Sequence, residues 1–227
     1  TLCFNAGDMD AQTFDESDSD SFKPGNAIRI DAGDLNDQKT LFEGIILQTG
    51  IRIGKGHRSM MVVECRDNAW PATQGRHNRI FEKKKDSEMI SEVLSAYGSV
   101  SVDGTDYQHP EMVQYYSTDW DFALSRADAC GLFILTTGSK IKIFKPEPGA
   151  SAVLTVTWGN DLIAFDCGLT AGDQFSGYDA VSWSPAEQKQ VKATASAPSL
   201  NSQGDLKASD LSADGNMLLQ TDAPTDS

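Results

Sequence analysis

The sequence has few basic residues. Its 227 residues include 19 Lys and Arg against 33 Asp and Glu, which gives a formal net charge of −14 at pH 7. A chain of this sign repels the phosphates of DNA and RNA, which nucleic-acid-binding proteins neutralise with clustered Lys and Arg. The one basic cluster, residues 83–85, is short and typical of the solvated approach to a helix. We therefore expect no nucleic acid among the partners.

Long apolar runs are also missing. A membrane-spanning helix needs about 18 consecutive apolar residues, whereas the longest run here, residues 132–135, is only long enough for a strand. The first residues include Asp8 and Asp10, where a secretory signal peptide has basic residues followed by an apolar core. The sequence thus predicts no membrane span and gives no targeting signal.

Cysteine is scarce, and none of the four cysteines forms a C-x-x-C pair. An even number allows disulfides, with several possible pairings. Most of the cysteines lie in or beside apolar stretches, where a reduced thiol behaves as a small buried side chain. We expect free thiols and a reducing compartment. The cysteines in or beside apolar stretches are Cys65, Cys130 and Cys167, and the fourth is Cys3.

The histidines do not form a metal motif. His57, His77 and His109 are far apart, without H-x-x-x-H or H-E-x-x-H spacing, and each lies in a loop-like segment. We expect them at the surface. The acidic stretch at residues 15–20 has oxygen ligands at alternate positions, but it lacks the central Gly and the distal Glu of a calcium loop. The sequence therefore predicts no metal and no other cofactor.

Recognisable catalytic motifs are absent from the sequence. There is no G-x-S-x-G elbow, and the glycines at residues 50–56 lack the spacing of a phosphate-binding loop, so they indicate a hairpin turn. Asp119 and Asp121 flank Trp120, but residues two apart on a helix point in different directions and cannot easily share a substrate. Their carboxylates are expected to stabilise the helix by interacting with the positive end of its dipole. We predict no catalytic residues and no enzyme activity.

What the sequence does contain is a pattern that changes its period along the chain. Residues 1–26 are acidic, which predicts a loop or a frayed terminus. Alternating apolar and polar residues then predict strands over residues 27–32, 42–53 and 60–66, with a glycine-rich turn at residues 54–57.

Helical spacing follows these strands. A helix is predicted over residues 87–97, started by Asp86 or Ser87 and stopped by Gly98 in a left-handed conformation. Its apolar stripe, spaced at i, i+3, i+4 and i+7, consists of Ile90, Val93, Leu94 and Tyr97.

A second helix is predicted over residues 118–130. Thr118 and Asp121 form a capping box at its start, and Gly131 ends it. A hairpin over residues 132–144 follows, with a turn around Gly138. The residues expected to line the inner face of this helix are Trp120, Leu124 and Ala127.

The C-terminal part is expected to return to β structure, with strands over residues 153–158, 162–167 and 180–183. Beyond residue 184 the chain is rich in Ser, Ala, Asp and Gln, which predicts a linker or a weakly ordered tail. The expected fold class is α+β, mainly β, with two antiparallel β-barrel-like units flanking an α/β insert. The expected boundaries are 1–26 for the acidic terminus, 27–68 for the first unit, 69–150 for the insert, 151–190 for the second unit and 191–227 for the tail.

The segment at residues 114–127, Q-Y-Y-S-T-D-W-D-F-A-L-S-R-A, is the most informative part of the sequence. Together with the glycine and the hairpin that follow, it resembles the signature helix of the VgrG and phage late-control-gene-D family. Supporting resemblance in order and spacing extends over residues 27–183, and includes F-E-G-I-I at residues 42–46. The signature residues are Gln114, Tyr115, Asp119, Trp120, Phe122, Arg126 and Gly131.

The resemblance implies a structural role in a contractile injection machine. Proteins of that family have two related β-barrels and an α/β insert, and three chains form a ring whose six barrel faces seat a hexamer of an Hcp-like tube protein. The resemblance therefore implies a homotrimeric hub/spike component of type VI secretion or of a phage-tail-like apparatus, which contacts a PAAR-like spike tip and baseplate proteins. Such a protein is assembled in the bacterial cytoplasm and then secreted or delivered with the apparatus. The OB-like barrel and β-helical needle of type VI spike proteins have no recognisable counterpart after residue 184.

Two other functional classes remain open on the sequence. A tail-associated cell-wall hydrolase would carry a catalytic Glu or a zinc triad in a cleft, and neither is recognisable at a known spacing. A generic β-rich binding module would be a monomer without affinity for a tube protein.

Overall fold

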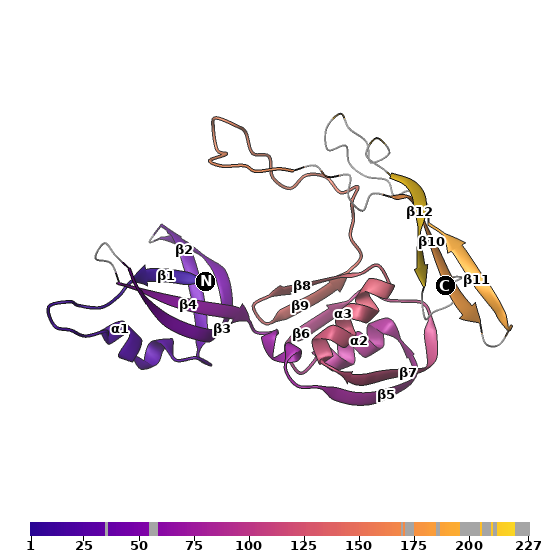
Figure 1. Cartoon of the computed structure of the whole chain (residues 1–227), viewed down its shortest axis with the longest axis horizontal. Coiled ribbons are helices and arrows are strands. Elements are labelled where there is room, and N and C mark those ends of the chain that lie inside the picture. Colours follow the sequence, from indigo (N-terminus) through magenta and orange to yellow (C-terminus); the bar gives the residue numbers. More distant parts are fainter. Residues whose placement is uncertain are drawn as a thin grey trace. The chain divides into compact units, whose positions relative to one another are not determined.

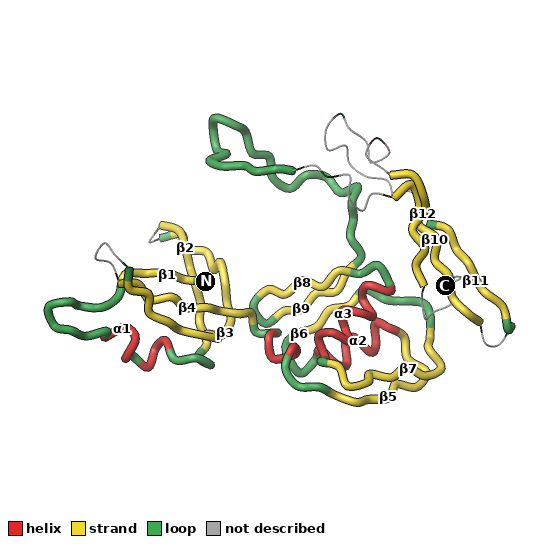
Figure 2. Tube along the Cα trace, viewed as in Figure 1, coloured by secondary structure: helices red, strands yellow, loops and turns green. Residues whose placement is uncertain are grey.

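Figures 1 and 2 show a computed structural model of the chain, which describes residues 1–34, 36–54, 59–168, 170, 175–184, 187–195, 205, 210 and 213–220. The chain divides into two compact units, Thr1–Lys145 and Pro146–Ser227. Strands account for 49% of the residues and helices are few, so the prediction of a mainly β protein is confirmed. The described strands form open sheets and no closed barrel. His57, with the rest of the predicted turn after Gly54, lies outside the described residues.

The first sheet of the N-terminal unit has four antiparallel strands in the order β1-β4-β3-β2 (Figure 1). Three of them confirm the strands predicted from alternation. The buried face of the sheet gathers Ile46, Met61 and Val63, each at most 1% exposed. The strands are β1 (Leu2–Asn5), β2 (Ala27–Asp34), β3 (Asp37–Ile53) and β4 (Ser59–Asp67).

The prediction of a loop over residues 1–26 is wrong in part. β1 pairs with β4 because its apolar side chains alternate with polar ones and pack against the buried face of the sheet. The acidic stretch forms the short helix α1 (Asp15–Asp18) and the 3-10 turn η1 (Asp20–Phe22). The ring of Phe22 lies 5.3 Å from that of Phe4, centroid to centroid. This aromatic contact anchors a segment whose acidic composition alone predicts mobility.

The rest of the N-terminal unit is an α/β sandwich. The helices α2 and α3 pack between the two-stranded ribbon β5–β7 and a three-stranded sheet with the order β6-β9-β8 (Figure 1). Phe81 of β5 stacks on Phe122 of α3 at 5.4 Å, while Ile141 and Ile143 of β9 are at most 1% exposed on the opposite side. The elements are η2 (Trp70–Thr73), β5 (His77–Lys85), α2 (Asp86–Leu94), β6 (Ser99–Val102), β7 (Gln108–Ser117), α3 (Asp119–Ala129), β8 (Phe133–Thr137) and β9 (Lys140–Phe144).

Helix α2 confirms most of the predicted apolar stripe, since Ile90, Val93 and Leu94 are at most 2% exposed, but Tyr97 lies beyond the end of the helix. Its cap differs from the prediction, because the N-cap residue is Lys85, whose backbone N–H donates to the Glu88 carboxylate at 2.8 Å. Neither Asp86 nor Ser87 is therefore needed as the cap, and the Asp86 side chain is available for a different contact.

Gly98 does not end helix α2 with a left-handed turn. The helix ends at Leu94, and Gly98 is not among the described glycines with positive φ. Its small size is required for another reason, because a Cβ atom at this position would lie 2.5 Å from the backbone oxygen of Ser139. Gly98 therefore lets the start of β6 approach the turn between β8 and β9.

Helix α3 and the hairpin after it confirm the predicted boundaries. The Thr118 hydroxyl accepts a hydrogen bond from the Asp121 backbone N–H at 2.9 Å, and Gly131 has a left-handed φ of 65°. The predicted inner face is wrong in part, because Leu124 is 38% exposed and Trp120 is only half-buried. The buried stripe, spaced at i, i+3, i+4, i+7 and i+8, is Asp119, Phe122, Ala123, Arg126 and Ala127.

The C-terminal unit contains a three-stranded sheet with the order β11-β10-β12. β10 (Phe175–Ser184) confirms the strand predicted over residues 180–183, but it pairs with β12 (Ala213–Gln220) in parallel rather than antiparallel. β11 (Lys189–Thr194) and β12 lie in the stretch predicted as a linker or tail, so that prediction is wrong where they occur. Pairing with β10 fixes these strands although they lie in a stretch rich in Ser, Ala, Asp and Gln, because strand formation depends strongly on neighbouring strands.

The strands predicted over residues 153–158 and 162–167 are not formed. This segment contains an isolated bridge between Trp158 and Leu162, around a turn in which the Thr157 backbone N–H donates to the Asp161 carboxylate at 2.5 Å. Alternation alone therefore overstated the regular structure here. Among the described residues, no helix is long and apolar enough to cross a membrane.

Candidate functional site

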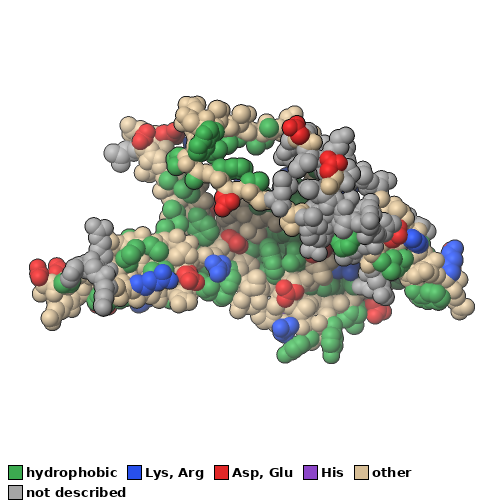
Figure 3. All heavy atoms as spheres, turned by 45° about the horizontal axis from the view of Figure 1, so that its top comes forward, with side chains coloured by type: hydrophobic (Ala, Val, Ile, Leu, Met, Phe, Trp, Pro, Cys, Tyr) green, Lys and Arg blue, Asp and Glu red, His purple; other side chains and the backbone are tan. Residues whose placement is uncertain are grey.

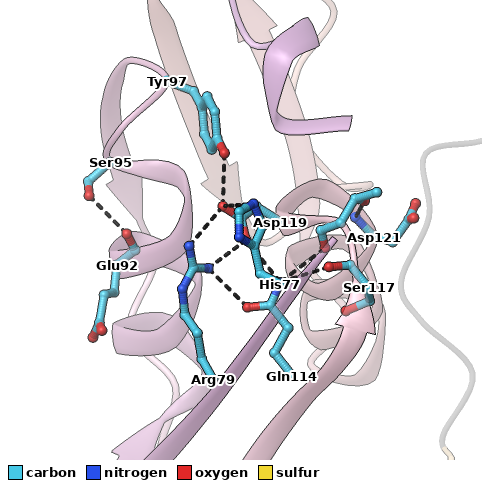
Figure 4. A network of polar contacts seen from close by, with 10 residues as sticks. His77, Arg79, Glu92, Ser95, Tyr97, Gln114, Ser117, Asp119 and Asp121 are labelled. Carbon is cyan, nitrogen blue, oxygen red and sulfur yellow. Dashed lines mark hydrogen bonds and ion pairs between the residues drawn. The ribbon is translucent and has the colours of Figure 1, made fainter. Parts of the chain in front are cut away.

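The signature segment occupies the junction between β7 and α3. Gln114 lies on β7 and Asp119 is the first residue of α3 (Figure 4). Gln114 is fully buried, Asp119 has 1% of its surface exposed, and Thr118 between them caps the helix. The junction thus places an amide and a carboxylate in the interior, where each polar atom needs a partner.

Asp119 is the centre of a network of polar contacts that joins several elements (Figure 4). Arg79 of β5 binds it with two nitrogens, Nη1 at 2.5 Å from Oδ1 and Nη2 at 3.2 Å from Oδ2. The Tyr97 hydroxyl donates to Oδ2 at 2.9 Å, and the Gln114 amide donates to Oδ1 at 2.9 Å. His77 lies further away, with Nε2 3.8 Å from Oδ2. Both carboxylate oxygens are therefore occupied by donors.

The network keeps Asp119 ionised. Burial by itself would raise the pKa of this carboxyl, but hydrogen bonds from Arg79, Gln114 and Tyr97 outweigh that effect and lower the pKa below its ordinary value. In the same network, burial and the hydrogen bond to Asp119 raise the pKa of Tyr97. A saturated, permanently charged carboxylate is suited to holding β5, β7 and α3 together, and poorly suited to accepting a proton from a substrate.

A second buried carboxylate, Asp86, lies at the start of α2. Arg126 of α3 donates to its Oδ1 from Nε at 2.6 Å, and His109 of β7 lies with Nε2 2.8 Å from Oδ2. The side chains of all three are at most 8% exposed. The prediction of His109 as a surface residue is therefore wrong, because the adjacent buried carboxylate gives its ring a hydrogen-bond partner in the interior.

The cysteines are all free thiols: Cys65 is buried, whereas Cys3 and Cys167 are exposed. Cys130, at the end of α3, is half-buried beside Asp86. Burial and the negative charge of Asp86 raise the pKa of Cys130 to about 11. Its thiol therefore stays protonated at neutral pH, where a reactive cysteine would be a thiolate.

The two buried carboxylates, whose pKa values are lowered, make the stability of the fold depend on pH. Asp86 and Asp119 both have folded-state pKa values below 3.8, so their contribution is complete above that value and is lost as the pH falls through the folded pKa. In urea titrations followed by circular dichroism, we expect these two groups to leave the midpoint unchanged from about pH 7 to about pH 5 and to lower it below about pH 4. In Asp119→Asn the acid-induced decrease is expected to be smaller, and an unchanged decrease would contradict this assignment.

The signature residues are thus divided between different environments. Gln114 and Asp119 share one network, Arg126 belongs to the other, and Phe122 lies in the core. Tyr115 is 82% exposed and lies in neither network. Among the described residues, no group of three or more His, Cys, Asp or Glu side chains is placed to hold a metal ion.

Comparison with known proteins places the chain in a family. The family described as the Alg8 N-terminal domain matches residues 1–226. This chain belongs to that family. No curated protein matches the sequence of this chain significantly.

Solved structures show which fold this Alg8 N-terminal domain has. It superposes on the 43 kDa tail protein of prophage MuSo2 from Shewanella oneidensis with a TM-score of 0.61 and 12% identity, over 89% of this chain and 59% of that protein. It superposes on a tail protein of Neisseria meningitidis MC58 with a TM-score of 0.57 and 14% identity, over 90% of this chain and 66% of that protein. The fold is that of these tail proteins, and the chain spans less than two thirds of the length of either.

The sequence did not identify most members of the two networks. Arg79, Tyr97, Asp86 and His109 were either unassigned or assigned to a cap, an apolar stripe or the surface. One signal was available: Asp119 and Arg126 stand seven residues apart and share a face with Phe122 on the predicted helix. Charged side chains on the apolar face of a helix indicate that each is paired with a group of opposite charge in the interior.

Proposed function

We propose that this chain is part of a structural hub component of a bacterial contractile injection apparatus, of the type VI or phage-tail-like kind. The observation that carries the proposal is the similarity of its fold to two tail proteins, one of them from a prophage, over 89% and 90% of the chain. The resemblance of the signature segment to VgrG and late-control-gene-D proteins supports the same assignment. In this role the protein is not an enzyme, and it contacts a spike-tip (PAAR-like) protein and baseplate proteins after assembly in the cytoplasm.

The proposed assembly is a homotrimer that seats a hexamer of Hcp-like tube protein. A trimer brings like charges together, since each chain carries −14. That repulsion is tolerable where the contact is apolar and the acidic groups lie at its periphery. Exposed apolar side chains are present for such contacts: Figure 3 shows them in patches on one face of the molecule, with acidic and basic groups scattered between them.

The test measures mass and tube binding together. Sedimentation velocity of the purified protein is expected to give the mass of three chains, and a pull-down with the tube protein encoded in the same gene cluster is expected to retain that protein. A monomer that does not bind the tube protein would contradict the proposal. Release of soluble fragments from purified cell wall would instead identify a hydrolase.

A further inference from the structure

The sheet β6-β9-β8 has an outer face that is unusual for a solvated surface. Its inner side buries Ile141 and Ile143, so the alternate residues of β8 and β9 point outward. β8 and β9 form an antiparallel hairpin, and the outward face of such a pair is ordinarily polar. Here Phe133 is 59% exposed and Leu135 is 52% exposed. We call this outward surface the basic–aromatic face. It consists of Phe133, Leu135, Lys140, Lys142 and Phe144.

The strand register makes these side chains neighbours. Phe133 is paired with Phe144, and their ring centroids are 6.4 Å apart in an edge-to-face arrangement. Leu135 is paired with Lys142, whose Nζ lies 4.9 Å from the centre of the Phe144 ring. On the other side of β9 the partners of the two lysines are small serines of β6. The face therefore combines apolar side chains with two exposed lysines, of which Lys142 lies over the Phe144 ring and Lys140 lines a surface pocket together with Glu43 and Asp67.

The charge of this face is opposite to that of the chain. Lys140 and Lys142 are exposed, and in the part of the chain that the structure describes no carboxylate forms an ion pair with either. The whole sequence has a net charge of −14. A partner that fits must present carboxylates opposite the lysines and an apolar group opposite the aromatic pair.

The chain itself contains a segment of that chemistry. We name residues 8–20 the acidic arm, which has six acidic residues and no basic one. Asp10, Asp15 and Asp18 are exposed, and no basic side chain among the described residues pairs with them. Met9, next to Asp10 in the sequence, is 72% exposed. The arm thus offers free carboxylates next to a flexible apolar side chain.

We infer that the basic–aromatic face of one copy of this chain receives the acidic arm of a second copy. Because the two surfaces differ, the contact is head-to-tail, and contacts of that kind close into rings when the rotation between copies allows it. The inference rests on the proposed function for the number of chains in the ring, which is three. Beyond the proposed function, it specifies which two surfaces are in contact and that opposite charges stabilise the contact.

A charge exchange tests the inference directly. The face variant is Lys140→Glu with Lys142→Glu, the arm variant is Asp15→Lys with Asp18→Lys, and the combined variant carries all four substitutions. Each single-surface variant is expected to weaken self-association, measured by sedimentation equilibrium, at least about tenfold. The combined variant is expected to restore it. Self-association of the parent protein is expected to weaken as salt is added, because exposed charges are screened.

A matched control separates local contact from overall charge. Lys39→Glu with Lys83→Glu changes the net charge as the face variant does, at two exposed lysines on other strands, and is expected to leave self-association unchanged. Circular dichroism and the urea midpoint verify that each variant folds.

The outcomes distinguish the inference from the proposed function. A trimeric parent protein whose face variant associates normally would overturn the inference and leave the proposed function standing. A face variant that associates normally but no longer binds the tube protein would assign the face to that protein, and would also overturn the inference. A parent protein that is monomeric at every concentration would contradict both.

Discussion

Replacing Asp86 by Ala is expected to lower the free energy of unfolding of the Thr1–Lys145 unit by about 3–5 kcal/mol. The substitution leaves the guanidinium of Arg126 and the ring of His109 buried without their acceptor, and their side chains are only 8% and 5% exposed. The unpaired charge, rather than the lost volume, causes the effect. Urea denaturation followed by far-UV circular dichroism measures it.

The control is Asp128→Ala, which removes an exposed carboxylate from α3. Surface substitutions of this kind change stability by less than about 0.5 kcal/mol. If Asp86→Ala behaved like Asp128→Ala, Arg126 and His109 would have to reach other acceptors, and the structural role given to the network would be wrong.

Phe122→Ala is expected to be the second large effect, a loss of about 3–5 kcal/mol, because it empties a buried site. The Phe122 ring is 5% exposed and stacks on Phe81 at 5.4 Å. Trp120→Ala removes a larger ring, but Trp120 is only half-buried at the edge of the same core. We expect it to cost about 1–2 kcal/mol.

These two variants are informative together because the expected losses of stability are in the opposite order to the sizes of the side chains removed. Thermal melting of both, measured side by side, is expected to give the lower midpoint for Phe122→Ala. The reverse order would place Trp120, and not Phe122, on the inner face of α3.

The parts of the fold that could be predicted are those determined by local physics. Alternation predicted β2, β3 and β4 because each strand buries one face. The hydroxyl of Thr118 and the left-handed Gly131 determined both ends of α3 without reference to the rest of the chain. The hairpin after α3 likewise follows from a turn with Gly138 at positive φ.

The parts that could not be predicted depend on distant partners. Apolar periodicity places Trp120 and Leu124 in the interior and Asp119 outside it. A carboxylate is stable in the interior only when an opposite charge pairs with it, and here Arg79 provides that charge from 40 residues away. β12 could not be predicted for the same reason, since the composition of the tail in which it lies indicates no strand and its partner β10 precedes it by a long stretch of chain.

The two buried carboxylates also have a mechanical consequence. Asp86 begins α2 and is held by Arg126 in the last turn of α3, whereas Asp119 begins α3 and is held by Tyr97 just beyond the end of α2. Each helix is therefore tied at both ends to the opposite end of its antiparallel neighbour. Sliding of the pair along its axis, in either direction, would stretch charged hydrogen bonds at both ends at once. The helix pair is thus braced against shear along its own axis.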